Sequence, residues 1–122
     1  MKYLTVEEII QTHDKLIELF GGEKGIVDKG PLDFIVNKIQ SSKTDIYHKS
    51  AMLLNEIITT HPFVDGNKRT AFETAKIFLR ENGKTLKIKD INQASEYIIN
   101  IAENKKNIFS IEHWIKTHCD EL

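Results

Sequence analysis

The sequence contains a single cysteine, Cys119, among its 122 residues. One cysteine cannot form an internal disulfide, which fits a reducing compartment, so we expect a cytoplasmic protein in which Cys119 has no functional role. Long apolar runs are absent too, because none approaches the roughly 20 residues of a membrane-spanning helix. Glu7 and Glu8 interrupt any signal-peptide pattern at the N-terminus. These absences predict a protein without a membrane partner.

An excess of charge of one sign is also missing. The 17 basic and 18 acidic side chains leave a net charge of −1. Without an overall basic character, the chain lacks the electrostatic footprint of a nucleic-acid-binding protein, and we expect no nucleic-acid partner. Hydrophobic residues make up 40% of the sequence, enough for one core at this length. No repeat or linker divides the chain, so we expect a single domain over residues 1–122.

Apolar residues recur at spacings of three and four along most of the chain, which is typical of amphipathic helices. Thr5 and Glu8 form a capping box before the first helix, and Asp90 and Ser110 are placed to cap the last two. Predicted helices begin near residues 5, 31, 45, 67, 90 and 110. Only residues 85–89 alternate like a short extended segment. The fold class is therefore predicted to be all-α, a compact bundle of about six helices with little or no sheet.

Chemically active side chains are concentrated in residues 61–70, which read HPFVDGNKRT. The stretch connects two predicted helices, and Phe63 is expected to anchor it in the core. His61 is able to accept a proton near neutral pH. Asp65 offers a hard oxygen ligand suited to Mg²⁺. The stretch therefore combines a base with a metal ligand.

The same stretch runs into the start of a helix, where backbone N–H groups and the helix dipole favour an anion. Gly66 lets the backbone approach a phosphate closely, and Asn67 is able to cap the helix or donate its amide to a phosphate. Lys68 and Arg69 add charged donors. An ordinary solvated turn explains these residues equally well, except that cations at a helix start oppose the dipole preference. A bound anion would account for them better.

The pattern in residues 61–69 resembles the signature of the Fic/Doc superfamily, His-x-Phe-x-Asp/Glu-Gly-Asn-Gly/Lys-Arg. Residues 4–14, 21–25 and 78–83 resemble the death-on-curing (Doc) branch, so the resemblance spans roughly residues 3–85. It implies a Fic/Doc-like helical fold and a toxin that modifies a protein hydroxyl with ATP and Mg²⁺. The implied roles are a general base at His61 and a metal ligand at Asp65. Phosphate contacts are implied for Gly66, Asn67, Lys68 and Arg69.

The resemblance also gives a role to residues 21–30, a loop that holds four of the six glycines and that we expect to be flexible. It would act as a flap that positions the target segment, with contacts from Gly22, Gly25, Ile26 and Val27.

Two residues depart from the pattern of family members that transfer AMP. Lys68 replaces a glycine that leaves room for the terminal phosphates, and Phe72 replaces a second arginine. Doc toxins share the lysine, so the resemblance implies phosphoryl transfer to a Ser/Thr of a protein target, a translation elongation factor. AMP transfer and a catalytically silent, partner-binding member remain alternatives.

Two further motifs were considered. An inhibitory helix of the family carries Ser/Thr-x-x-x-Glu-Gly/Asn, but after Thr117 and Glu121, on what we expect to be a terminal helix, the chain has Leu122. Inhibition by a separate antitoxin in trans is therefore expected. His13 and Asp14 suggest a metal phosphohydrolase of the HD type, which needs an earlier histidine that this chain lacks. We expect His13 to be a hydrogen-bonded core residue.

Overall fold

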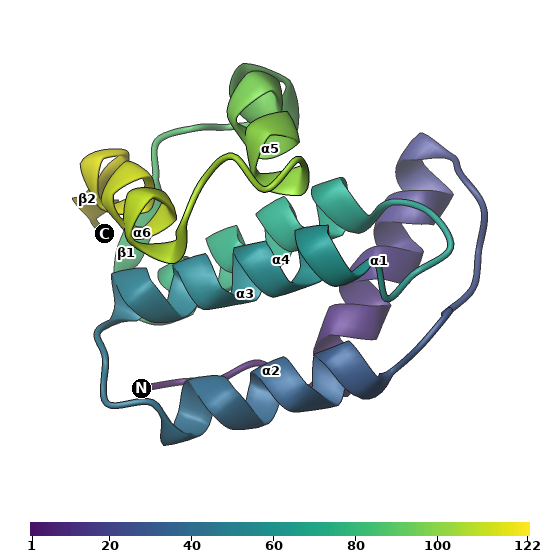
Figure 1. Ribbon diagram of the computed structural model, residues 1–122, viewed down its shortest axis with the longest axis horizontal. Coiled ribbons are helices and arrows are strands. Elements are labelled where there is room, and N and C mark those ends of the chain that lie inside the picture. Colours follow the sequence, from purple (N-terminus) through teal and green to yellow (C-terminus); the bar gives the residue numbers. More distant parts are fainter.

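Helix α3 (Ile46–Thr60) lies at the centre of the fold and contacts four other helices (Figure 1). The computed structural model describes residues 1–122. The helices around α3 are α2 (Gly30–Ser41), α4 (Asn67–Glu81), α5 (Ser95–Ala102) and α6 (Ile108–Thr117). Helix α1 (Val6–Phe20) crosses beside α4, and a short 3₁₀ helix, η1 (Ile91–Ala94), precedes α5. The predicted all-α bundle of about six helices is confirmed.

The core fills the space around α3 with apolar side chains from all six α-helices. Its largest fully buried members are Phe63, Phe72, Phe78, Ile9, Leu32, Ile35, Leu54, Ile57, Ile58, Leu79, Ile98 and Ile101. Helix α3 is buried over much of its circumference, because neighbours cover it on several sides. None of the helices combines the length and apolar character needed to cross a lipid bilayer.

Local sequence signals set both ends of α1. The Thr5 hydroxyl accepts a hydrogen bond from the Glu8 N–H at 3.1 Å, and the Glu8 carboxylate accepts one from the Thr5 N–H at 3.0 Å. The predicted capping box is therefore confirmed, and such a cap typically contributes about 1 kcal/mol. At the other end Gly21 adopts a φ of 87°, which a residue with a Cβ rarely takes, and the helix stops there.

The C-terminal segment differs from the prediction in two ways. Asn107, not Ser110, caps α6, since its side chain accepts a hydrogen bond from the Ser110 N–H at 2.8 Å. Both residue types cap well, so the spacing alone did not decide between them. After a turn at His118 the chain is extended, and strand β2 (Cys119–Glu121) pairs antiparallel with β1 (Lys84–Leu86). The expectation of a terminal helix carrying both Thr117 and Glu121 was wrong.

Helices α3 and α4 form a hairpin whose connection is the motif loop, residues 61–66. In Figure 1 this connection lies beside α1 and on the same side of the molecule as the α1–α2 loop. The fold thus brings the sequence motif against the glycine-rich segment, residues 21–29, and against the side of α1.

Candidate active site

His61 is the residue at which α3 ends. Its backbone is left-handed, with φ 52° and ψ 61°, and its N–H donates to the Ile57 carbonyl at 3.3 Å. For a residue other than glycine this conformation is uncommon and costs roughly 1–2 kcal/mol. The His61 side chain is exposed. A strained, exposed histidine where the loop begins suits a base that must meet an external hydroxyl.

Phe63 and Asn67 fix the loop to the bundle. The Phe63 ring is 1% exposed, as expected of a core anchor. The Asn67 side chain is also buried and makes two hydrogen bonds to the Phe63 backbone. Its Oδ1 accepts from the Phe63 N–H at 3.0 Å, and its Nδ2 donates to the Phe63 carbonyl at 2.9 Å. Gly66 occupies the N-cap position of α4, and as a glycine it supplies no side-chain capping bond. The Asn67 amide is thus occupied inside the loop, and any contact with a phosphate falls to its backbone N–H.

The Asp65 carboxylate is oriented by two backbone amides. Its Oδ2 accepts from the Glu23 N–H at 3.1 Å, and its Oδ1 accepts from the Gly66 N–H at 2.8 Å. The amide of Glu23, then that of Gly66, lowers the Asp65 pKa below 3.8, with a smaller contribution from nearby His13. Asp65 is therefore ionised at neutral pH, and it is exposed to solvent.

Asp65 fits one kind of metal site. Nowhere does the chain gather three or more His, Cys, Asp or Glu side chains that would hold a metal ion together. Mg²⁺ is commonly bound by one or two carboxylates, with substrate phosphates and waters completing the octahedron. A carboxylate has about four lone-pair positions, and two are used here. An ionised, exposed Asp65 beside a helix N-terminus fits a Mg²⁺ ion that arrives with a nucleotide.

The start of α4 presents cations at the positive end of a helix. Gly66 has a φ of 78°, and a Cβ there would lie 3.1 Å from the Ile17 Cδ1 atom, so only glycine fits without displacement. The Lys68 side chain is exposed. The Arg69 guanidinium lies 4.2 Å above the Phe20 ring, which limits its motion. Phe20, the last residue of α1, is largely exposed apart from this contact with Arg69.

Phe72 belongs to the core and not to the site. Its ring is 1% exposed and lies within the main apolar cluster. The position that carries a second arginine in the AMP-transferring pattern therefore serves packing in this chain. Lys68 and Phe72 are the two residues that differ from that pattern, and of these only Lys68 is exposed to solvent.

The glycine-rich loop runs along the motif loop. Ile26 and Phe63 form an antiparallel β-bridge, with the Val64 N–H donating to the Gly25 carbonyl at 3.0 Å and the Val27 N–H donating to the Pro62 carbonyl at 2.8 Å. These bonds tie the loop, which we expected to be flexible, to the motif. Ile26 and Val27 are exposed. Their role in docking a target segment stays a prediction, as does that of Gly22 and Gly25.

His13 is a buried core histidine, as predicted, but it also contacts the motif loop. Its ring is fully buried, and its Nε2 donates to the Asp65 backbone carbonyl at 2.8 Å. The sequence predicted a hydrogen-bonded core histidine, and a buried polar ring needs a partner. Nothing in the sequence identified that partner, because it lies 52 residues away.

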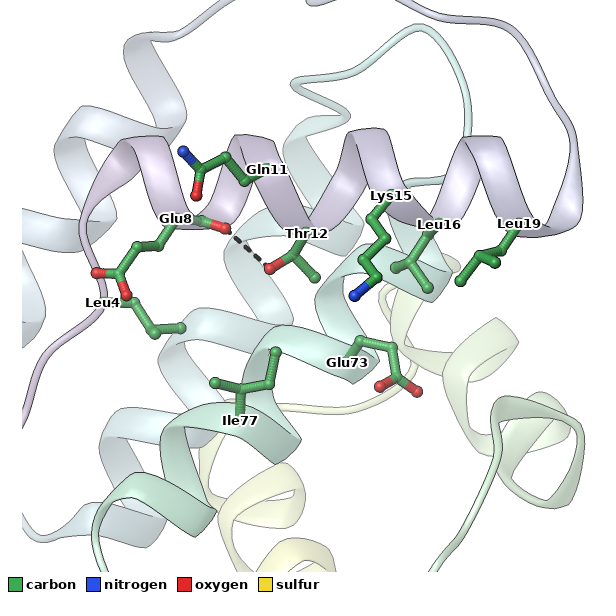
Figure 2. A pocket seen from close by; sticks show the side chains of 9 residues that line it. All are labelled: Leu4, Glu8, Gln11, Thr12, Lys15, Leu16, Leu19, Glu73 and Ile77. Carbon is green, nitrogen blue, oxygen red and sulfur yellow. Dashed lines mark hydrogen bonds between the residues drawn. The ribbon is translucent and has the colours of Figure 1, made fainter.

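A groove of about 450 Å³ between α1 and α4 was not anticipated. Figure 2 shows its lining residues: Leu4, Glu8, Gln11, Thr12, Lys15, Leu16 and Leu19 from the N-terminal segment and α1, with Glu73 and Ile77 from α4. The Thr12 hydroxyl donates back to the Glu8 carbonyl at 2.8 Å within α1. The groove includes none of His61, Asp65 and Lys68, so it is separate from the motif residues.

Comparison with known proteins agrees with this arrangement. The profile of the Fic/DOC family matches residues 3–79, which include the whole motif. "Protein kinase doc" of Escherichia phage P1 is 31% identical over 116 residues, covering 91% of this chain and 90% of the relative. "Toxin Doc" of Mycolicibacterium smegmatis is 34% identical over 99 residues, covering 75% of this chain and 76% of the relative. The resemblance to the Doc branch is confirmed, and the chain belongs to the Fic/DOC family.

Proposed function

We propose that this chain is the toxin of a toxin–antitoxin pair and transfers the γ-phosphoryl group of Mg-ATP to a hydroxyl of a target protein. The proposal rests on Lys68 and Phe72, the two residues that differ from the pattern of family members that transfer AMP. Lys68 is exposed at the start of α4, and Phe72 is buried in the core. The name of one relative, a protein kinase, supports the same reaction class, and the name of the other, a toxin, supports the toxin assignment.

The reaction needs a base beside the attacking hydroxyl. The His61 ring accepts the proton of a target serine or threonine while the hydroxyl oxygen bonds to the γ-phosphorus. The bond from the γ-phosphorus to the β–γ bridging oxygen breaks, and ADP leaves. A positioned base typically contributes about 10²–10⁴-fold to the rate. The exposure of His61 at the end of α3 leaves it open to a protein substrate.

The nucleotide is held by the start of α4. Backbone N–H groups of the first turn, together with Lys68 and Arg69, donate to phosphate oxygens. The Lys68 side chain fills the space that a glycine would leave for terminal phosphates, so ATP binds reversed with its γ-phosphate towards His61. Asp65 holds Mg²⁺ through its unused lone pairs. When bound, the ion neutralises phosphate charge as the transition state forms.

Two partners follow from the proposal. The target is a translation elongation factor, the hypothesis that the Doc resemblance favours. The inhibitor is a separate antitoxin, since the Thr117–Glu121 spacing lies partly on strand β2 and the inhibitory sequence is incomplete.

The test is incubation of the purified protein with an elongation factor and ATP labelled separately at the α and γ positions. We expect label on the target from γ-labelled ATP alone, with loss of labelling in His61→Ala. The matched control is His113→Ala, because His113 is another exposed histidine, on α6, away from the motif. Label transferred from the α position would overturn the kinase assignment. Absence of Mg-ATP binding in calorimetry would instead favour a silent, partner-binding protein.

A further inference from the structure

The His13 ring contacts three residues of the motif loop, Phe63, Asp65 and Gly66. Its plane stacks on Phe63 with ring centroids 3.8 Å apart and an interplanar angle of 5°. Its Nε2 lies 2.8 Å from the Asp65 carbonyl oxygen. A Cβ built on Gly66 would lie 3.7 Å from the same nitrogen, so the ring also lies against that residue. One side chain of α1 thus supports three of the four residues from Phe63 to Gly66.

The hydrogen-bond partners of the ring determine which atoms donate. A carbonyl oxygen only accepts, so the His13 Nε2 carries the hydrogen of the bond to Asp65. The Asp14 carboxylate lies 3.0 Å from Nδ1, and it accepts a second hydrogen bond there only when the ring carries hydrogens on both nitrogens. In that form the exposed Asp14 side chain helps to hold the buried ring in the orientation that points Nε2 at the loop. This is how carboxylates often orient histidines from a second layer around a site.

The Asp65 residue is consequently fixed at both ends. His13 holds its backbone carbonyl, while the amides of Glu23 and Gly66 hold its carboxylate. Without His13 the Asp65 carbonyl would lose this hydrogen bond, the backbone there would be less restrained, and the carboxylate would shift away from the two amides. Ile17, one turn further along α1, lies beside both segments, since its Cδ1 would be 3.0 Å from a Cβ built on Gly22 and 3.1 Å from one built on Gly66.

We propose that His13 is a positioning residue that aims the Asp65 carboxylate at the metal–nucleotide site. This inference rests on the proposed function in assigning Mg-ATP to Asp65. The contact between His13 and the loop is a separate matter that can be measured without nucleotide. Loss of the Nε2 donor weakens Mg-ATP binding by on the order of tenfold, an effect typical of removing a group that orients a metal ligand. The His61 base itself is untouched.

The experiment compares four variants. His13→Phe keeps the stacked ring but removes the donor. His13→Gln places an amide nitrogen at the level of Nε2, whereas His13→Asn places it at the level of Nδ1, too short to reach Asp65. The matched control is His48→Phe, because His48 also bonds a carboxylate, Glu112 at 2.8 Å, but lies on α3 away from the loop.

The first readout is the pair of backbone amide NMR signals of Glu23 and Gly66 in the nucleotide-free protein. We expect both signals to move in His13→Phe and His13→Asn, and to stay near their native positions in His13→Gln and His48→Phe. If His13→Phe does not fold, the comparison of Gln with Asn decides. Unchanged amide signals in the variants lacking the donor, or equal shifts in Gln and Asn, would overturn the positioning role.

The second readout is Mg-ATP binding by calorimetry. We expect about tenfold weaker binding in His13→Phe and near-native binding in His13→Gln. Native affinity in a folded His13→Phe variant would contradict the inference. If the unmodified protein binds no Mg-ATP, the proposed function fails, and the amide signals alone then decide whether His13 holds Asp65.

Discussion

Replacing Gly22 with alanine separates backbone strain from damage to the site, because its neighbour Gly21 provides a matched control. Both glycines have a positive φ, 117° at Gly22 and 87° at Gly21. Gly21 combines this φ with a ψ of 177°, and backbone strain of this kind costs a residue with a Cβ on the order of 1–3 kcal/mol. We therefore expect backbone strain to lower the free energy of unfolding of both variants.

The two positions differ in what the new methyl group would meet. At Gly21 nothing lies within 4 Å. At Gly22 the Cβ would lie 2.8 Å from the Asp65 Oδ2 and 3.0 Å from the Ile17 Cδ1. Non-bonded heavy atoms prefer about 3.5–4.0 Å, so the carboxylate must move away by more than about half an ångström. Oδ2 is the atom that accepts the Glu23 N–H, and this bond breaks when it moves.

The assay joins urea unfolding with Mg-ATP calorimetry. We expect both variants to lose stability, with the larger loss in Gly22→Ala because of the added clash, and weaker Mg-ATP binding in Gly22→Ala alone. Native-level Mg-ATP binding by both variants would refute the claim that the Asp65 orientation matters for the nucleotide. A binding loss of the same size in Gly21→Ala would show that general loosening of the loop, and not the contact with Asp65, is responsible.

Three further predictions follow from single side chains. His61→Gly removes transfer activity yet raises the free energy of unfolding by about 0.5–1 kcal/mol, because relief of left-handed strain exceeds the entropic cost of glycine, and a lower thermal midpoint would contradict this. Phe72→Arg, which restores the arginine of the AMP-transferring pattern, destabilises the fold by about 3 kcal/mol or more because the position is buried, and a stable variant in urea unfolding would show otherwise. Burial raises the pKa of Cys119 from an ordinary 9.0 to about 11. At pH 8 this lowers the thiolate fraction about 100-fold, while the higher pKa makes each thiolate more nucleophilic, so a disulfide reagent should react roughly tenfold more slowly with the native protein than with the urea-unfolded chain. Similar rates would count against this burial.

Much of the fold was predictable because its signals are local. The capping box of Thr5 and Glu8, the stop at Gly21 and the proline in the first turn of α2 act within one helical turn, and the structure contains all three. The motif in residues 61–69 indicated the family for the same reason, since its signature is contiguous in the sequence.

The features that the sequence did not predict depend on contacts between distant segments. Strand β2 exists because Cys119–Glu121 pairs with Lys84–Leu86, a contact that helical spacing cannot reveal. The bond between His13 and Asp65 joins a helix to a loop 52 residues later. Asn67 looked like a cap or a phosphate ligand, but its amide closes the loop around Phe63. In each case the residue type was suggestive, and only the three-dimensional arrangement decided its partner.

The most direct test of the proposed reaction is the intact mass of the target protein after incubation with unlabelled Mg-ATP. We predict a gain of one phosphoryl group on a serine or threonine, dependent on His61 and unaffected by His113→Ala. A gain equal to AMP, or a phosphoryl gain that persists in His61→Ala, would contradict the assignment of Lys68 and Phe72 to phosphoryl transfer and of His61 to its base.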